Sequence, residues 1–182
     1  MLRKLSLFAL LCAVFVANVH TSHAAGLKGK TLYTQVNIYS LKGKSVTWVN
    51  YQVDSLIPVN TEVTVNYARK SGLAFTIKKT GQKLELNNKK RHSGLDDIAW
   101  ANKHLGEEMV DLSKFTDFER DAIHAAQVKT GMSRDAVIVS RGYPPAHKTP
   151  DLNASEWLYW HNRWNKMAVT FDADGKVSGI RE

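Results

Sequence analysis

Basic side chains are concentrated in one part of the chain, and such a cluster is suited to electrostatic contact with an anionic surface. Residues 25–92 hold twelve Lys or Arg against three acids, a net charge of +9, whereas residues 93–182 hold eleven against fourteen, a net charge of −3. Clustered cations add about 1 kcal/mol each at an anionic surface at low salt. We therefore predict contact with an anionic surface, and a solvated linker is the alternative. The predicted contact residues are Lys78, Lys79, Lys83, Lys89, Lys90 and Arg91.

A second group suited to recognition lies in residues 155–177, SEWLYWHNRWNKMAVTFDADGKV, which hold three of the five tryptophans. Trp, Tyr and Arg dominate the energetics of protein interfaces. On the expected strand SEWLYW both alternating sets of side chains are apolar, so we expect both faces to be covered. A partner could cover the second face; the alternative is packing against helices on one side and the β-rich segment on the other. The predicted partner or interdomain face is Trp157, Tyr159, Trp160, Arg163 and Trp164.

No motif for catalysis or metal binding accompanies these two groups. The histidines at positions 92, 104, 124, 147 and 161 do not pair at i+2, i+3 or i+4, and no Gly-x-Ser-x-Gly elbow occurs. Asp172 to Gly175 is similar to half of a calcium loop, but Lys176 follows where further oxygen ligands are needed. A hairpin turn with Gly175 in the left-handed region accounts for the stretch and would place Phe171 opposite Val177. We predict no enzyme activity, no catalytic residue, no metal and no cofactor.

The first 24 residues have the layout of a secretory signal peptide. Basic MLRK precedes an apolar run, and small residues precede a cleavage site after Ala24. An uncleaved N-terminal anchor is the alternative. Cys12, the sole cysteine, lies inside the apolar run, where it is not placed for lipidation. We expect a periplasmic or secreted protein, peripheral to the outer membrane if bound there, not lipidated and without a transmembrane span after signal removal.

Short strands are expected to position the basic residues. Residues 31–86 are rich in β-branched and aromatic residues, in five runs separated by turn-forming residues. They predict a small antiparallel barrel in a domain spanning residues 27–90. The segment LIPVNTEVTV and the strand spacing resemble bacterial SH3-like domains, which often bind cell-wall or peptide ligands. Ser93 is the expected N-cap of a helix that stops at Gly106, within a helical linker of residues 91–115.

Residues 116–182 carry signals for two helices followed by three antiparallel strands. Thr116 and Glu119 form an expected capping box at the start of the first helix. Ser133 is the expected cap of the second helix, which ends at Gly142.

The same region resembles the SmpA/OmlA (BamE-like) family in the segments VKTGMSRDAVIVSRGYPPAHKTPD, EWLYW and AVTFDADGKVSGI. The matching positions are Gly131, Met132, Ser133, Val137, Gly142, Tyr143, Pro144, Trp157, Tyr159, Phe171, Asp172, Gly175 and Val177. The resemblance implies two helices packed on a three-stranded antiparallel sheet, in a small exported module without catalytic activity. The family's lipidated cysteine directly after the signal has no counterpart here.

These observations predict an α+β protein, in which a small antiparallel SH3-like barrel precedes a BamE-like domain of two helices on a three-stranded antiparallel sheet. The expected function is an exported, non-enzymatic binding or scaffold protein of the cell envelope, linked to outer-membrane assembly or integrity. A secreted inhibitor or ligand-capture protein that uses the aromatic sheet face is the alternative, and an envelope enzyme ranks last. The expected partners are an envelope protein, an anionic envelope polymer or lipid headgroups, and not nucleic acid.

Overall fold

Two β-sheets account for most of the regular structure. The computed structural model describes residues 26–182, and the predicted signal peptide, residues 1–24, lies outside the described residues. The larger sheet consists of β1 (Thr31–Thr34), β2 (Ile38–Leu41), β3 (Ser45–Thr47), β4 (Leu56–Ile57), β5 (Glu62–Arg69), β6 (Gly72–Ile77), β7 (Lys83–Asn87) and β8 (Leu105–Gly106). Its strand order is β4-β2-β3-β7-β6-β5-β1-β8.

The smaller sheet and the helices follow the larger sheet in the chain. The helices are α1 (Lys90–Ser93), α2 (Asp97–His104), the short 3-10 helix η2 (Leu112–Lys114), α3 (Asp117–His124) and α4 (Arg134–Arg141). The smaller sheet has the order β11-β10-β9 and consists of β9 (Glu156–Trp160), β10 (Lys166–Phe171) and β11 (Val177–Arg181). Within residues 26–182, no helix has the length and apolar character needed to cross a membrane.

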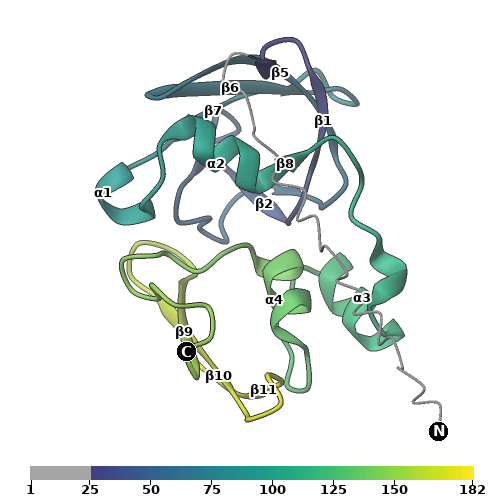
Figure 1. Cartoon of the computed structure of the whole chain (residues 1–182), viewed down its shortest axis with the longest axis vertical. Coiled ribbons are helices and arrows are strands. Elements are labelled where there is room, and N and C mark those ends of the chain that lie inside the picture. The colour runs from purple at the N-terminus through teal and green to yellow at the C-terminus, as the bar shows by residue number, and fades with distance from the viewer. Residues whose placement is uncertain (1–25) are drawn as a thin grey trace, which may run out of the picture.

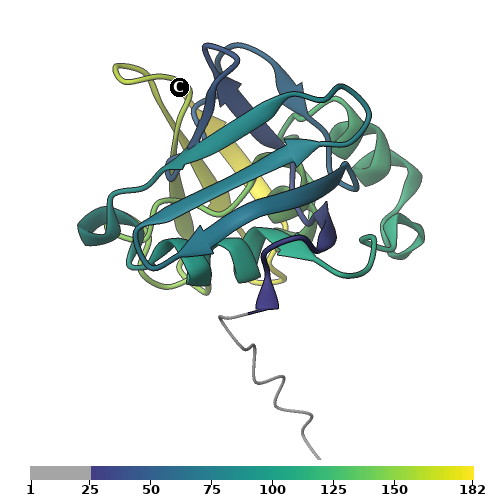
Figure 2. The ribbon, with the colours of Figure 1, turned by 90° about the horizontal axis from the view of Figure 1, so that it is seen from above.

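The centre of the larger sheet is the antiparallel meander β5–β6–β7, the teal strands that lie side by side across the front of Figure 2. Alternate side chains of these strands point to the two faces of the sheet, so Val63, Val65 and Leu84 enter one hydrophobic core while the residues between them face outward. The opposite face of the meander is therefore free to carry polar residues.

The predicted fold class is wrong for the N-terminal region. Instead of a closed antiparallel barrel of five strands, the chain forms a curled half-barrel of eight strands that includes the parallel pair β3–β7. Its outermost strands, β4 and β8, do not pair with each other. The expected strand TLYTQVNIYSL divides into β1 and β2. At Asn37, between the two strands, the chain leaves the strand path, because the Asn37 side chain hydrogen-bonds to Val59 and Ile123.

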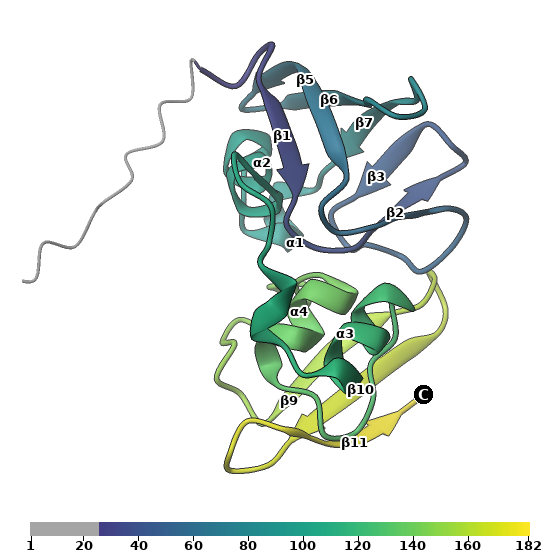
Figure 3. The ribbon, with the colours of Figure 1, turned by 90° about the vertical axis from the view of Figure 1, so that its right-hand side faces the viewer.

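The predicted BamE-like arrangement of two helices on a three-stranded sheet is likewise corrected. The molecule is mostly sheet, its helices are few and short, and α4 is shared between two hydrophobic cores. Ile138 of α4 packs against the core of the larger sheet and against the core that includes Trp157 and Val169 of the smaller sheet. Figure 3 shows α3 and α4 in the region between the two sheets, and Figure 1 shows them beside the smaller sheet. The predicted domain boundaries stay predictions.

Local signals in the C-terminal half are confirmed. Thr116 and Glu119 form the expected capping box of α3, and the Ser133 side chain caps α4 by accepting a hydrogen bond from the Ala136 amide. Gly175 has a φ of 73°, in the left-handed region. The expected helix from Ser93 to Gly106 is misplaced, however, because α2 is capped by Asp96 and ends at His104.

Buried polar side chains join the two halves of the molecule. Asn37, 1% exposed, donates from Nδ2 to the carbonyls of Ile123 and Ser140, and its Oδ1 accepts from the Val59 amide. Arg141, also 1% exposed, reaches main-chain carbonyls on both sides of the junction, those of Asn50 at 2.8 Å and Trp160 at 2.7 Å. Buried polar groups need such partners, so this network ties the larger sheet to the helices and to β9.

Candidate functional site

The six predicted basic contact residues fall into two groups on either side of β7. Positions 78, 79 and 83 flank the turn between β6 and β7, whereas positions 89–91 follow the other end of β7. Five residues at about 3.3 Å each place these groups roughly 16 Å apart. Lys78 is also engaged, because its Nζ lies 2.7 Å from Glu62 Oε1, and the hydrogen bond and charge of Glu62 raise the pKa of Lys78. The run is not one patch.

The second basic group is held in place by a cluster of three aromatic rings. Trp48, just after β3, stacks on His92 of α1 with ring centroids 5.2 Å apart, and His147 meets His92 edge to face at 4.9 Å. The His147 amide also donates to the His92 carbonyl. Burial lowers the pKa of His147, and the neighbouring His92 and Lys148 lower it further, so the neutral form is favoured. The turn that carries Lys90 and Arg91 is thereby fixed to both halves.

Beside α1, the outward face of the larger sheet forms a polar groove. Ser45, Glu85, Ala74 and Tyr67 occupy one registered row across β3, β7, β6 and β5, and cross-strand partners share a face. The Tyr67 ring lies against Gly72, where an added Cβ would be 3.2 Å from ring atom Cε2. The groove is an open depression of about 650 Å³. Its lining is Ser45, Tyr67, Lys70, Ser71, Gly72, Leu73, Glu85, Leu86, Asn87, Asn88, Lys90 and Asp97.

Two lysines line this groove, and three further cations lie beside them in the chain. Lys70 comes from the β5–β6 turn and Lys90 from α1, and both line the groove. Arg69, Lys89 and Arg91 are their neighbours in the chain, and all five side chains are exposed. Among the ion pairs within residues 26–182, none involves any of these five cations. We name these five residues the groove cations.

Sequence reasoning missed part of the groove. It singled out positions 89–91 but not Lys70 and Tyr67, which join Lys90 of α1 in the groove only in the folded chain, nor Arg69, whose guanidinium lies 5.8 Å from the Tyr67 ring centroid. Their position depends on α2, because the Asp97 amide donates to the Lys70 carbonyl at 3.2 Å. The available signal was the pair Arg69-Lys70 directly before the turn residues Ser71-Gly72, since a tight turn exposes the side chains beside it.

The predicted aromatic face is divided by the sheet. Trp157 and Tyr159 are 0% and 1% exposed and belong to the core beneath the helices. The Tyr159 hydroxyl donates to the Gly142 carbonyl, and burial raises the pKa of Tyr159. Arg134 of α4 closes this core from the side, with its guanidinium carbon 4.1 Å from the Phe171 ring centroid. These two aromatic residues stabilise the fold and are not presented to a partner.

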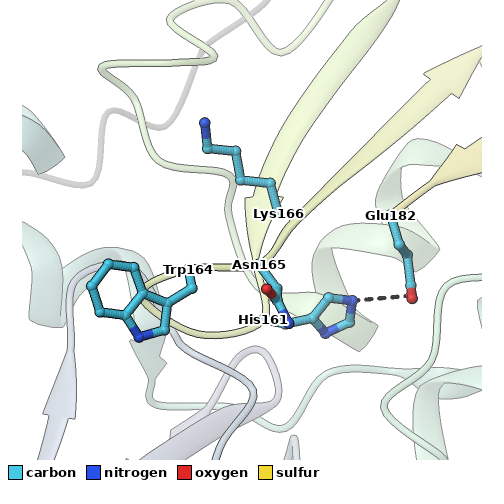
Figure 4. Close-up of a pocket in the computed structure, with 5 residues that line it drawn as sticks. All are labelled: His161, Trp164, Asn165, Lys166 and Glu182. Carbon is cyan, nitrogen blue, oxygen red and sulfur yellow. Dashed lines mark hydrogen bonds and ion pairs between the residues drawn. The ribbon is translucent and has the colours of Figure 1, made fainter.

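The opposite face of the smaller sheet carries Trp160, and charged side chains of the same sheet extend over it. Lys166, the cross-strand partner of Trp160, places its Nζ 4.8 Å from the Trp160 ring centroid. An ion pair between Arg181 and Glu156 joins β11 to β9. Arg163 and Trp164 lie beyond the strands, in the turn between β9 and β10, which Figure 4 shows in close-up.

Comparison with protein-family models, with curated proteins and with solved structures gives no match. The function is therefore inferred from the arrangement of side chains.

The histidine with the largest pKa shift has a structural role. His104 lies against Trp100 with ring centroids 4.0 Å apart, and burial lowers its pKa to about 3. Its Nδ1 donates to the Trp100 carbonyl at 2.8 Å, because a carbonyl can only accept. No cluster of three or more His, Cys, Asp or Glu side chains suited to a metal ion occurs in the described part of the chain.

Proposed function

We propose that the chain is an exported, non-enzymatic protein of the cell envelope that holds an anionic wall polymer in the groove beside α1. The observation that carries this proposal is the set of five groove cations, which are exposed and free of acidic partners within residues 26–182. Cations left unpaired around a depression raise the local concentration of an anionic ligand.

The groove lining supports a polymer that carries hydroxyl and amide groups as well as charge. Tyr67 offers an aromatic surface, and the Ser45 hydroxyl and the Asn87 amide offer hydrogen-bond donors and acceptors. Two carboxylates also line the groove: Asp97 is buried and accepts from Asn88, whereas Glu85 is exposed and can accept from sugar hydroxyls. Lys70 and Lys90 are suited to the carboxylates or phosphates of the same chain. An open depression accommodates an extended polymer better than an enclosed cavity would.

The export and the link to outer-membrane assembly or integrity belong to the proposal, supported by the signal-like first 24 residues and the SmpA/OmlA resemblance. The alternative, an inhibitor that uses the aromatic sheet face, is less well supported because Trp157 and Tyr159 are buried. We therefore place the ligand at the groove.

The test is sedimentation of the mature chain with purified wall fragments at low and high salt. We expect Lys70→Ala combined with Lys90→Ala to weaken retention roughly 30-fold at low salt, since two cations add about 1 kcal/mol each. At high salt the difference should shrink, because screening weakens exposed charge pairs.

The matched control removes two other exposed lysines. Lys79→Ala combined with Lys83→Ala changes the net charge equally but lies at the far end of β7. Retention of this control should stay near that of the parent. If both double variants lose retention equally, total charge and not the groove determines binding, which contradicts the proposal. A parent chain that is not retained at low salt would also refute it.

A further inference from the structure

The turn between β9 and β10, residues 161–165, presents a tryptophan that the fold does not use. Trp164 is 78% exposed, whereas Trp100 and Trp157 are 2% and 0% exposed. The ring contact found for Trp164 is with its chain neighbour Arg163. A ligand that covers this side chain removes a large apolar area from water, which favours binding.

The backbone of this turn is fixed even though the tryptophan side chain is free. Asn162 Oδ1 accepts hydrogen bonds from the amides of Trp164 at 2.8 Å and Asn165 at 2.9 Å. The His161 amide donates to the Asn165 carbonyl at 2.9 Å and closes the loop. The backbone that carries Trp164 is therefore ordered before any ligand arrives, which lowers the backbone entropy lost on binding.

Cations lie next to both tryptophans at this end of the sheet. The guanidinium carbon of Arg163 is 5.3 Å from the Trp164 ring centroid, and Lys166 Nζ is 4.8 Å from the Trp160 ring centroid. A depression of about 580 Å³ adjoins the turn, lined by His161, Trp164, Asn165, Lys166 and Glu182. Figure 4 shows Trp164 and Lys166 pointing away from the pair formed by His161 and Glu182.

We propose that this turn docks onto a lipid bilayer whose headgroups are anionic, with Trp164 at headgroup level and Arg163 and Lys166 against the phosphates. Tryptophan favours the membrane interface, and long cationic side chains lie along apolar surface while their charges stay at the polar side. A projecting turn can reach a flat bilayer. This docking does not depend on the groove beside α1.

The test is binding of the mature chain to vesicles, followed by cosedimentation and by quenching of tryptophan emission with brominated lipids. Trp164 is the most exposed of the described tryptophans, so quenching reports chiefly on its insertion. We expect binding to vesicles that contain phosphatidylglycerol and much weaker binding to phosphatidylcholine alone. Removing Arg163 and Lys166 together should cut the preference for anionic vesicles about fivefold per cation.

Trp164→Ala should abolish both the quenching and most of the binding. The matched control is Phe118→Ala on α3, which removes another aromatic side chain that is 45% exposed. The ring centroid of Phe118 also lies near a cation, 6.0 Å from Lys129 Nζ. This control should bind as the parent does. Undiminished vesicle binding by Trp164→Ala, equal loss in Phe118→Ala, or no vesicle binding by the parent overturns the proposal. The variant that lacks Lys70 and Lys90 should keep its vesicle binding, which separates this test from that of the groove.

Discussion

Glu119 is a carboxylate that couples two helix starts. Its Oε1 accepts from the Ser133 amide at 2.7 Å, and its Oε2 accepts from the Thr116 amide at 3.2 Å. Burial opposes ionisation most strongly, but the hydrogen bonds from Ser133 and Thr116 outweigh it and lower the pKa of Glu119 to about 2. Lys176 Nζ, 3.7 Å away, is the nearest cation.

Replacing Glu119 by Gln should lower the free energy of unfolding at neutral pH by about 1–3 kcal/mol, because a buried amide donor is left poorly paired. The pH dependence should change as well. A depressed pKa stabilises the folded state above the unfolded value near 4.5, and this stabilisation is lost as pH falls toward 2. The free energy of unfolding of the variant should therefore not show this loss between pH 4.5 and pH 2. Urea titrations across this range measure both effects, and Asp121→Asn, an exposed change on the same helix, should leave both unaltered.

At the scale of elements, α2 packs against Tyr143 through His104, a histidine that stays neutral. His104 lies between the stacked Trp100 ring and the edge of Tyr143, and Lys103 Nζ lies 3.8 Å from the Tyr143 ring centroid. Burial, with a smaller contribution from Lys103, holds the pKa of His104 near 3. Below about pH 6.5 the unfolded chain gains a proton on His104 that the folded chain does not bind, so stability falls as pH decreases.

Between pH 6.5 and pH 5 the free energy of unfolding should fall less steeply in His104→Phe than in the parent. The difference in slope should be up to about 1.4 kcal/mol per pH unit. Phenylalanine keeps a ring against Trp100 but cannot be protonated. His147, whose pKa is also lowered, keeps a slope of the same sign in the variant. Thermal unfolding at several pH values provides the measurement. The exposed His124→Phe exchange should retain the parental slope, and an unchanged slope in His104→Phe would contradict the assignment.

Sequence reasoning succeeded where a single element decides the outcome. The caps at Thr116 and Ser133 and the turn at Gly175 each depend on neighbours within four residues, so their local patterns were sufficient. The division between β1 and β2 depends instead on Asn37, whose partners Ile123 and Ser140 lie 86 and 103 positions away. No local pattern contains that information.

The same limit applied to the candidate site. The run at positions 89–91 was visible as charge, but its role depends on which other side chains meet it. Tyr67 and Lys70 join it through the β5–β6 turn, which α2 contacts through the Asp97 amide. A charge run could therefore predict an anionic partner without locating the groove, and the other basic group at the β6–β7 turn could not be told apart from it.

At the scale of the whole molecule, the two cores are joined by a buried polar network in which Asn37 has three partners. Two acceptors, the carbonyls of Ile123 and Ser140, belong to α3 and α4, and the Val59 amide belongs to the segment between β4 and β5. Because both sheets depend on this junction, the chain should unfold as one cooperative unit.

Asn37→Ala should lower the free energy of unfolding by about 3–5 kcal/mol, since three buried partners lose their hydrogen bonds. It should also separate the two cores, so that amides of β9–β11 exchange with solvent at lower urea than those of β5–β7. Asn37→Asp keeps an acceptor for the Val59 amide but has no donor for the two carbonyls, so it should be no more stable than the alanine variant. Hydrogen exchange at graded urea concentrations distinguishes the two cores, with the exposed Asn153→Ala as the matched control. If β9–β11 and β5–β7 still exchange together in Asn37→Ala, the coupling lies elsewhere, and Arg141 with its carbonyl partners Asn50 and Trp160 is the next connection to remove.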